Sequence, residues 1–452
     1  MKVNRPILGR TLAVILPSAA LLAVGRAGLA CWWFYAALAV IVTYDTVQHR
    51  HLQCMAVILA VTPMLLLLRD RLLYSGPEIL FVAAMVQAPM EDLKRLRANR
   101  LAMGLVLAAV IYWLASFAYT GEYASNYRSL ELVLSASVLY LLAQHRSYLR
   151  PALLGFALSS IAVGFGLLPN GPAMINGIAV LRLGLARIEG RGIGNPISFG
   201  LTVTIVFLLT ISSSGRWLGL AGRKTALLAL QLIAAVWLLL STSRGSWAVA
   251  LVGAIIIYWA EPRQRRLLFG GAVLLLLMGA FFTLFTHDTT LTSYLEKTFS
   301  GDVSLDKLTT GRAKQWASFP AAWADAPLFG HGPGTSLEEG KIYFDKNLIY
   351  HSLFLQIGVE TGSFGLILLF VFLYLLLRKA YRYYCVTGDP IALIGWAGYV
   401  MAGLSVPALD AASGAFLGLA LIGTDLTNFV VVRHAVIAVP AALQADAAYP
   451  AN

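Results

Sequence analysis

The sequence predicts an all-α, polytopic integral membrane protein, on three observations. Hydrophobic residues make up 59% of the 452-residue chain and charged residues only 12%, about half the charged fraction of a soluble globular domain. Apolar runs of about 17 to 22 residues recur along the chain, and each can cross a hydrocarbon core of about 30 Å as a helix. Basic residues gather between these runs. The alternation of a transmembrane β-barrel is missing from the sequence, so helices are the expected spans.

Fourteen apolar segments are candidate helices: 7–24, 28–47, 53–69, 76–90, 101–119, 129–144, 151–168, 197–213, 225–242, 246–260, 267–286, 352–377, 390–408 and 412–432. The segment 76–90 is weak because Pro77 and Glu78 lie at its start. The first two segments are open to a partly interfacial placement. We therefore expect about 12 to 14 transmembrane helices.

Basic clusters orient these helices, because Lys and Arg favour short cytoplasmic loops. The clusters lie at 94–100, 145–150, 216–224, 263–266 and 378–382. Threading the helices through them puts both termini inside and leaves 120–128, 169–196 and 287–351 outside. The expected divisions are N-terminal transmembrane helices over 1–286, a large outer loop over 287–351, C-terminal transmembrane helices over 352–434 and a flexible tail over 435–452. The net charge of +12 is then explained mostly by the basic residues of the cytoplasmic loops, and no nucleic-acid partner is expected.

The large outer loop has its own local pattern. Ser293 to Phe299 and Arg312 to Trp323 are expected to be short helices, the second because its apolar residues recur at helical spacing. The glycines and prolines of 327–334 then predict a turn. His351 ends the loop where the next apolar run begins. A histidine at a membrane boundary can act as a base on the water-facing side.

Arginines on the expected outer face are candidate ligands for phosphate. They are Arg187 and Arg191 in RIEGRGIGNP, Arg244 in STSRGSW and Arg312 in TTGRAKQW. These arginines run against the cytoplasmic bias of the other basic residues, and a guanidinium fork matches phosphate oxygens bidentately. If 187–191 were helical, the first two would share a face. Pairing with nearby acids or with lipid phosphates is the structural alternative for any one of them.

Sequence patterns for cofactors are missing. The three cysteines are too far apart for a zinc pattern, and the chain has no HExxH or nucleotide motif. We expect no cofactor and no metal. The role of His331, among the glycines of LFGHGPG, stays open.

The residues that carry these signals resemble the O-antigen ligase and polymerase family of bacterial inner-membrane glycan enzymes. Four pieces match in order: Arg187 with 190–196, STSRG at 241–245, the GR…W of 311–316, and PLFGHGPG at 327–334 leading to HSLFLQIGVETGSFG at 351–365. The resemblance covers 187–365. Ser352 stands where many relatives have Asn, and His331 stands at a usually apolar position.

The resemblance implies glycan transfer from undecaprenyl diphosphate on the periplasmic face of the inner membrane. His351 takes the place of the family's essential loop histidine, as a general base. Arg187, Arg191, Arg244 and Arg312 fall where the family's arginines lie, as ligands of the donor diphosphate. The expected acceptor is the lipid A-core oligosaccharide, in a metal-independent, inverting ligation. The alternatives are O-antigen polymerase, protein O-oligosaccharyltransferase and, more remotely, a polysaccharide or lipid transporter.

Overall fold

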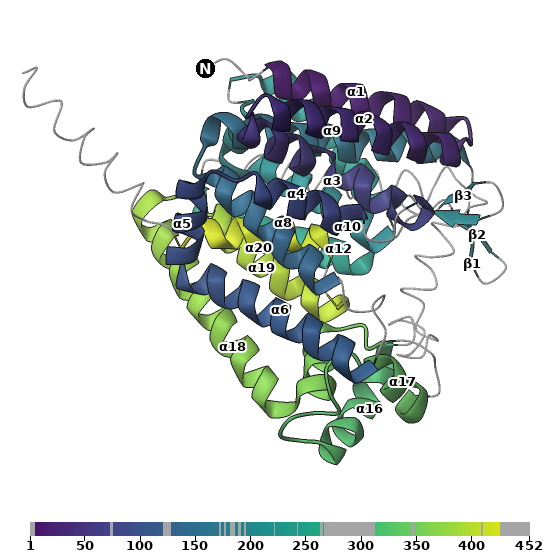
Figure 1. Ribbon diagram of the computed structural model, residues 1–452, viewed down its shortest axis with the longest axis vertical. Helices are drawn as coiled ribbons and strands as arrows, with labels where there is room; N and C mark the ends of the chain where they lie inside the picture. The colour runs from purple at the N-terminus through teal and green to yellow at the C-terminus, as the bar shows by residue number, and fades with distance from the viewer. Residues whose placement is uncertain are drawn as a thin grey trace, which may run out of the picture.

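The protein is described by a computed structural model, which is a bundle of helices with two small hairpins (Figure 1). The description covers residues 5–72, 76–120, 128–170, 173–175, 178–180, 186–188, 191–193, 196–220, 222–241, 243–262, 265, 312–344, 349–407 and 410–424. The apolar segments become helices because a chain in hydrocarbon must satisfy its backbone hydrogen bonds within each segment.

The helices of the first half are α1 (Arg5–Ala23), α2 (Ala27–Val47), α3 (His51–Leu72), α4 (Gly76–Val86), α5 (Met90–Ala98), α6 (Arg100–Thr120), α8 (Arg128–Ala143) and α9 (Arg146–Leu167), followed by the 3-10 helix η1 (Leu168–Asn170). Those of the second half are α10 (Pro196–Ile211), the 3-10 helix η2 (Ser212–Leu218), α11 (Lys224–Leu240), α12 (Arg244–Ala260), α16 (Arg312–Asp325), α17 (Ser336–Phe344), α18 (Leu353–Thr387), α19 (Ile391–Ser405) and α20 (Ala411–Ile422).

The all-α, polytopic fold class is confirmed. Among the described residues, six helices are long and apolar enough to cross a membrane, and six shorter apolar helices accompany them. The expected helix 267–286, residues 425–432 of the expected helix 412–432, and the tail 435–452 lie outside the described residues. The segment 76–90 is shorter than expected: α4 ends at Val86, and the basic stretch after it forms the separate helix α5.

Small residues let several helices approach closely, as is usual between membrane helices. A Cβ on Gly155 of α9 would lie 2.6 Å from the Cβ of Ala60 in α3. One on Gly395 of α19 would lie 2.6 Å from the carbonyl oxygen of Phe416 in α20. The central helices α3, α9 and α20 are accordingly buried along most of their length.

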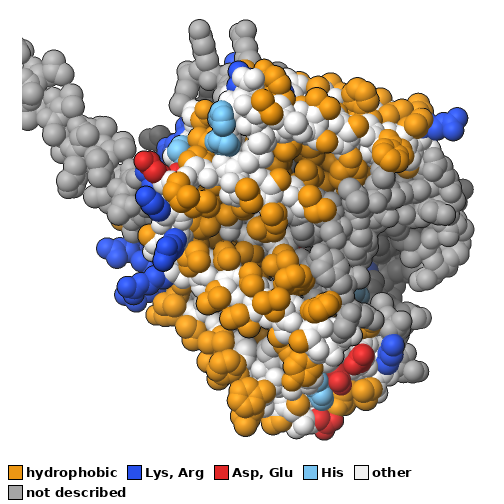
Figure 2. Space-filling view, in the orientation of Figure 1, with side chains coloured by type: hydrophobic (Ala, Val, Ile, Leu, Met, Phe, Trp, Pro, Cys, Tyr) orange, Lys and Arg blue, Asp and Glu red, His pale blue; other side chains and the backbone are white. Residues whose placement is uncertain are grey.

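Four of the basic clusters, those at 94–100, 145–150, 216–224 and 378–382, meet at one end of the bundle, which we call the basic end. Asn99, between α5 and α6, donates to Thr424 after α20 at 2.5 Å, and Gly423 packs against Ala380 of α18. The Nε2 of His145, the residue before α9, lies 2.8 Å from a carboxylate oxygen of Asp92 in α5. Figure 2 shows Lys and Arg side chains gathered on the side of the molecule where α5 lies, beside a broad hydrophobic surface.

The opposite end, which we call the loop end, joins the starts of α8, α10, α12, α18 and α20. Ser198 of α10 donates to Asp410, the residue before α20, at 2.6 Å. The backbone N–H of Ala411 in α20 donates to Glu131 of α8 at 2.9 Å. Figure 1 shows α6 and α18 both leading from the side of α5 toward α16 and α17.

The described part of the large loop forms a compact unit on the start of α18. Ala322 of α16, Phe344 of α17 and Tyr350 pack with Leu355 and Val359 of α18 in a small buried cluster. Helix α16 confirms the predicted helix over Arg312 to Trp323. Helix α17 was missed, and the predicted helix over Ser293 to Phe299 lies outside the described residues.

Two antiparallel hairpins interrupt the predicted outer segment 169–196. Strands β1 (Ala173–Ile175) and β2 (Ile178–Val180) form one, and β3 (Ala186–Ile188) and β4 (Arg191–Ile193) form the other. In the second hairpin Arg187 pairs with Gly192, and Ile188 with Arg191. The stretch is therefore not helical, and the shared helix face considered for Arg187 and Arg191 does not exist.

Candidate active site

The backbone of His351 is held between α16 and the end of α19. Its N–H donates to the side-chain oxygen of Gln315 in α16 at 2.7 Å. The neighbouring Ser352 donates its hydroxyl to the carbonyl of Gly403 at 3.1 Å, and the N–H of Leu353 donates to the carbonyl of Val406 at 3.1 Å. Ser352 is buried and His351 half-buried, so the histidine lies at a fixed, partly open position at the loop end.

Arg312 approaches the same place through α16. It is the first residue of that helix, and Gln315 follows three residues later, which places both on one side of the helix. Gln315 also donates to the carbonyl of Ile349 at 3.4 Å. Gln315 thus bonds to the residues before and after Tyr350 in the chain. These bonds hold the turn of α16 that carries Arg312 beside the segment that carries His351.

Arg244 is brought to the same end of α19 through α12. Ser243 caps the helix by accepting a hydrogen bond from the N–H of Ser246 at 3.4 Å, so Arg244 is the first helical residue. A Cβ on Gly245 would lie 2.9 Å from the Cβ of Ser405, the residue before Val406. Arg244 and His351 therefore flank the same end of α19.

The hairpin that carries Arg187 and Arg191 joins the loop end through α10. Strand β4 ends at Ile193 and α10 begins at Pro196. A Cβ on Gly200 of α10 would lie 2.5 Å from the hydroxyl of Ser246, next to Arg244 in α12. The structure thus brings the backbone of the hairpin to the loop end of the bundle, and the side chains of Arg187 and Arg191 lie outside its description.

Helix α18 is broken at Gly362, a feature that the continuous helix expected over 352–377 did not include. Gly362 has a left-handed φ of 63°. The break frees the carbonyls of Val359 and Glu360, and the N–H groups of Ser363 and Phe364, which would bond to each other in a regular helix. Four backbone groups therefore need other partners.

The glycine-rich turn supplies those partners. The N–H groups of His331 and Gly332 donate to the carbonyls of Val359 and Glu360, and the N–H groups of Ser363 and Phe364 donate to the carbonyls of Pro327 and Leu328, all at 2.8 to 3.1 Å. Close approach requires glycine here. A Cβ on Gly330 would collide with the backbone of Glu360. The turn predicted at 327–334 is confirmed. It supplies the hydrogen-bond partners that the break in α18 leaves without a helical partner.

A fully buried carboxylate fixes the turn from the other side. Glu360 accepts a hydrogen bond from the N–H of Gly334 at 3.0 Å and from Gln356 at 3.0 Å. Tyr112 of α6 also donates its hydroxyl to Glu360. Glu360 thereby joins α6, α18 and the turn beside the His351 segment. In the sequence, the signal for Glu360 is that an isolated acid stands at the start of an apolar run.

His331 links the two short helices of the loop. Its Nε2 lies 2.8 Å from the carbonyl oxygen of Ala322 in α16, so Nε2 carries the proton. Its Nδ1 lies 3.4 Å from the carboxylate of Glu339 in α17. Burial raises the pKa of Glu339, and the nearby imidazole of His331 opposes that rise. These contacts give His331 a structural position in the loop.

The described fold is that of a multi-pass helical membrane protein, with a folded loop and several arginine-bearing segments gathered at one end of the bundle. Residues 229–370 match the family model described as O-antigen ligase, so this part of the chain is similar to that family. The comparison with curated proteins gives no match. Members of the family are glycan-transferring enzymes, ligases or polymerases, that use lipid-linked glycans. The match includes Arg244, Arg312 and His351, and begins after Arg187 and Arg191.

Proposed function

We propose that the protein is an O-antigen ligase: it moves a glycan en bloc from undecaprenyl diphosphate to the lipid A-core oligosaccharide. The reaction takes place on the periplasmic face of the bacterial inner membrane. His351 is the general base, and Arg187, Arg191, Arg244 and Arg312 hold the donor diphosphate. No metal or cofactor takes part.

One observation supports this proposal most strongly. Two segments that are far apart in sequence, around Arg244 and His351, contact the same end of α19 through Gly245 and Leu353. The segment around Arg312 is bound to the His351 segment through Gln315. Convergence of cations and a histidine at one end of a membrane bundle suits an anionic, lipid-anchored donor. A transporter instead favours charged groups along the interior of the spans.

The chemistry follows from these positions. Guanidinium groups bind phosphate oxygens through paired N–H donors, and they stabilise the charge that grows on the diphosphate as the sugar–phosphate bond breaks. The neutral imidazole of His351 accepts the proton of the acceptor hydroxyl while that oxygen attacks the anomeric carbon. Attack opposite the leaving diphosphate inverts the configuration at that carbon. The proton ends on the imidazole, and undecaprenyl diphosphate leaves as the anion.

The orientation rests on the two ends of the bundle. The clusters at 94–100, 145–150, 216–224 and 378–382 lie at the basic end, and such clusters favour the cytoplasm. The loop end then faces the periplasm, where nucleotide-sugars are missing and the donor must already carry its leaving group. The proposed divisions at 1–286, 287–351, 352–434 and 435–452 follow from the same orientation.

The test is transfer by the purified protein, with carrier-linked glycan and lipid A-core oligosaccharide as substrates, in EDTA and without ATP. A core-linked product, formed with inversion, is the expected outcome. Lengthened carrier-linked chains would instead show a polymerase. Glycan on Ser or Thr of a protein acceptor would show a protein O-oligosaccharyltransferase. Loss of all transfer in EDTA, with recovery on adding Mg²⁺, would contradict the metal-independent mechanism.

A further inference from the structure

The glycine-rich turn of the large loop carries two exposed apolar side chains. Leu328 is 66% exposed and Phe329 is 72% exposed. Phe364, the second residue after the break in α18, is 57% exposed, and its ring centre lies 6.0 Å from that of Phe329. The carbonyl of Leu328 also accepts the N–H of Phe364 at 3.1 Å. These three residues therefore form one apolar surface, which we call the apolar tip.

The apolar tip continues an exposed face of α18. Leu368, Val371 and Leu375 are all exposed, and they follow Phe364 in steps of four, three and four residues, so the four side chains share one helix face. Helix α18 is long and apolar enough to cross a membrane. Exposed apolar side chains of a span face acyl chains of similar polarity. Figure 2 shows hydrophobic side chains along the side on which α18 lies in Figure 1, down to the lower end of the molecule.

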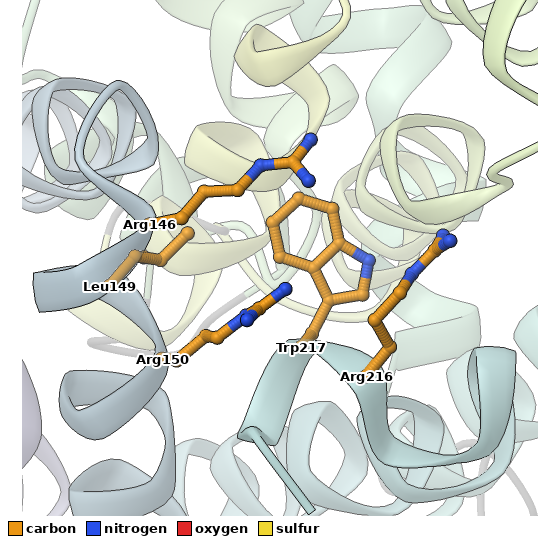
Figure 3. A pocket seen from close by; sticks show the side chains of 5 residues that line it. All are labelled: Arg146, Leu149, Arg150, Arg216 and Trp217. Atoms are coloured by element: carbon orange, nitrogen blue, oxygen red, sulfur yellow. The ribbon is translucent and has the colours of Figure 1, made fainter. Parts of the chain in front are cut away.

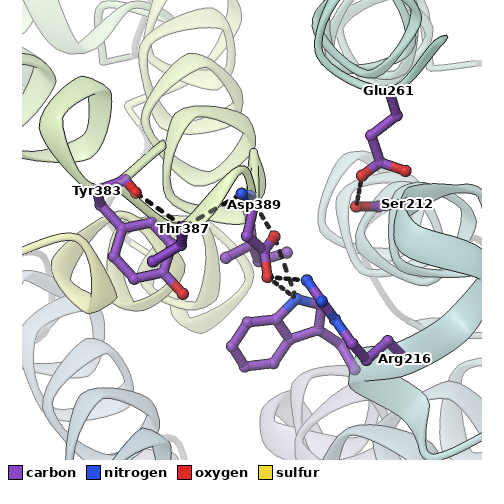
Figure 4. Close-up of polar contacts among 8 residues, drawn as sticks. Ser212, Arg216, Glu261, Tyr383, Thr387 and Asp389 are labelled. Atoms are coloured by element: carbon purple, nitrogen blue, oxygen red, sulfur yellow. Dashed lines mark hydrogen bonds and ion pairs between the residues drawn. The ribbon is translucent and has the colours of Figure 1, made fainter. Parts of the chain in front are cut away.

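The other end of α18 lies at the basic end of the bundle. Arg146 and Arg150 of α9 line a small pocket together with Arg216 of η2 (Figure 3). Arg216 in turn donates at 2.5 Å to Asp389, which comes two residues after α18 (Figure 4). Lys and Arg side chains near the end of a span reach the headgroups. This end of α18 therefore marks the headgroup level of one leaflet.

The length of α18 places the apolar tip within the membrane. Arg378 and Arg382 are exposed near the basic end of the helix, and Phe364 comes 14 and 18 residues before them. These separations correspond to about 21 and 27 Å along a helix, whereas the hydrocarbon core is about 30 Å thick. Measured from either arginine, Phe364 lies a few ångströms inside the far boundary of the hydrocarbon, and any tilt of α18 places it deeper.

Polar groups beside the apolar tip are bonded within the protein, as a position in hydrocarbon requires. The four backbone groups at the break in α18 are paired with the turn. The hydroxyl of Ser363 donates to the carbonyl of Pro327 at 2.7 Å. The nearest charged side chains in the sequence are those of Asp325, which accepts from α17, and His331, which bonds to α16. Both are thus engaged within the loop unit.

We propose that the apolar tip inserts into the acyl chains of the leaflet at the loop end and anchors the large loop to the membrane. The occupant of this surface is lipid, because the tip continues the lipid-facing side of α18 and lies within the thickness of the hydrocarbon. The turn at 327–330 then dips back into the membrane from the outer loop. A thiol at this shallow depth stays within reach of reagents at the headgroups. The proposal does not rest on glycan transfer.

The test compares nitroxide labels at two positions that are equally exposed within the protein. Phe329→Cys carries the label at the apolar tip. Ile342→Cys is the matched control, because Ile342 is 70% exposed and shares a face of α17 with the exposed Glu338. Both variants are made in a Cys385→Ser chain, since Cys385 is exposed. The labelled full chain is placed in nanodiscs of dioleoylphosphatidylglycerol, whose two faces are both open to reagents, so the result does not depend on orientation.

The measurement is the collision rate of each label with oxygen, which concentrates in acyl chains, and with a water-soluble nickel complex. The ratio of the oxygen rate to the nickel rate should be at least about tenfold higher at 329 than at 342, because hydrocarbon excludes a polar complex by at least this factor. Leu328→Cys, a second label position on the tip, should give the same result if the first variant does not fold.

Two outcomes would overturn the proposal. Equal ratios at 329 and 342 would show that the tip lies in water. Low collision rates with both oxygen and nickel at 329 would show that protein, such as a second copy of the chain, covers the tip in place of lipid.

Discussion

His351 is the residue on which the proposed chemistry depends most directly. We expect His351→Ala to lower the rate of transfer by about 10²- to 10⁴-fold, the usual loss on removing a general base, with normal membrane insertion. The measurement is kcat for carrier-linked glycan with lipid A-core acceptor. His49→Asn is the matched control, because His49 lies exposed in a turn between α2 and α3 with a left-handed φ of 53° that Asn tolerates. A His351 variant that turns over as fast as this control would refute the role.

We expect Gln315 to position His351, a role that no sequence pattern indicated. Its side-chain oxygen accepts the backbone N–H of His351 at 2.7 Å, and a lost partner leaves a partly buried N–H unsatisfied at about 1 to 3 kcal/mol. Gln315→Leu should therefore lower kcat by roughly tenfold or more while KM for the donor changes little. Gln315→Glu, which keeps an acceptor, should restore much of kcat. Equal losses in the two variants would mean that the hydrogen bond does not position the histidine.

Tyr343 offers a test of the loop by titration. Its hydroxyl donates to Asp325, and this hydrogen bond, with a smaller contribution from burial, raises the pKa of Tyr343 to about 12 from an ordinary value of 10.0. Ionisation would place two anions in contact. The contact between α16 and α17 is therefore stable below pH 10 and is lost as the pH rises from about 10 to about 12.

The measurement is the phenolate absorbance of the wild type minus that of Tyr343→Phe across this range. The difference should titrate near pH 12. A difference curve centred near pH 10 would show that the contact with Asp325 is not made in solution.

At the scale of elements, the glycine-rich turn and the broken helix α18 act as one unit. The break at Gly362 leaves backbone groups that the turn satisfies, and Glu360 fixes the turn through the N–H of Gly334. Neither partner is complete alone. The turn is also bonded to the start of α18, which begins two residues after His351, so its geometry bears on the candidate active site.

Alanine variants of two glycines with the same φ distinguish the loss of this contact from the backbone strain that any alanine would suffer there. Gly330 and Gly388 both have a φ of 69°, but a Cβ on Gly330 would meet the backbone of Glu360, whereas one on Gly388 would meet open space. Gly388→Ala should cost only the left-handed penalty of about 1 to 2 kcal/mol. Gly330→Ala should in addition displace the turn, and it should open the 326–344 region to limited proteolysis and abolish transfer. Similar protease sensitivity in the two variants would contradict this coupling.

At the scale of the whole molecule, the bundle has a basic end and a loop end, and their orientation can be read with cysteines. Cys31 and Cys54 are buried, and Cys385 is exposed at the basic end of α18. Phe329, in the turn at the loop end, is 72% exposed. A membrane-impermeant maleimide added to cells with a permeable outer membrane should label Phe329→Cys and leave Cys385 unlabelled. Labelling of Cys385 alone would reverse the proposed orientation.

Much of the fold was predictable because hydropathy reports directly on membrane helices. The apolar runs gave the helices near their observed bounds, and apolar spacing gave α16. The segment around Arg187 and Arg191 was not predictable, because short Gly-rich stretches do not distinguish a helix from a hairpin. Helix α17 was missed because its nine residues carry only a weak pattern.

The sequence alone determined the membrane class, the helical architecture and the residue types that suit phosphate binding and proton transfer, because these follow from local composition and spacing. Tertiary structure alone decided which of those residues meet. The approach of the Arg244 and His351 segments to one end of α19, the contact of the Arg312 helix with the His351 segment, and the pairing of the glycine turn with the broken α18 depend on contacts between segments far apart in sequence. No local pattern contains such contacts, since they arise only when the helices pack.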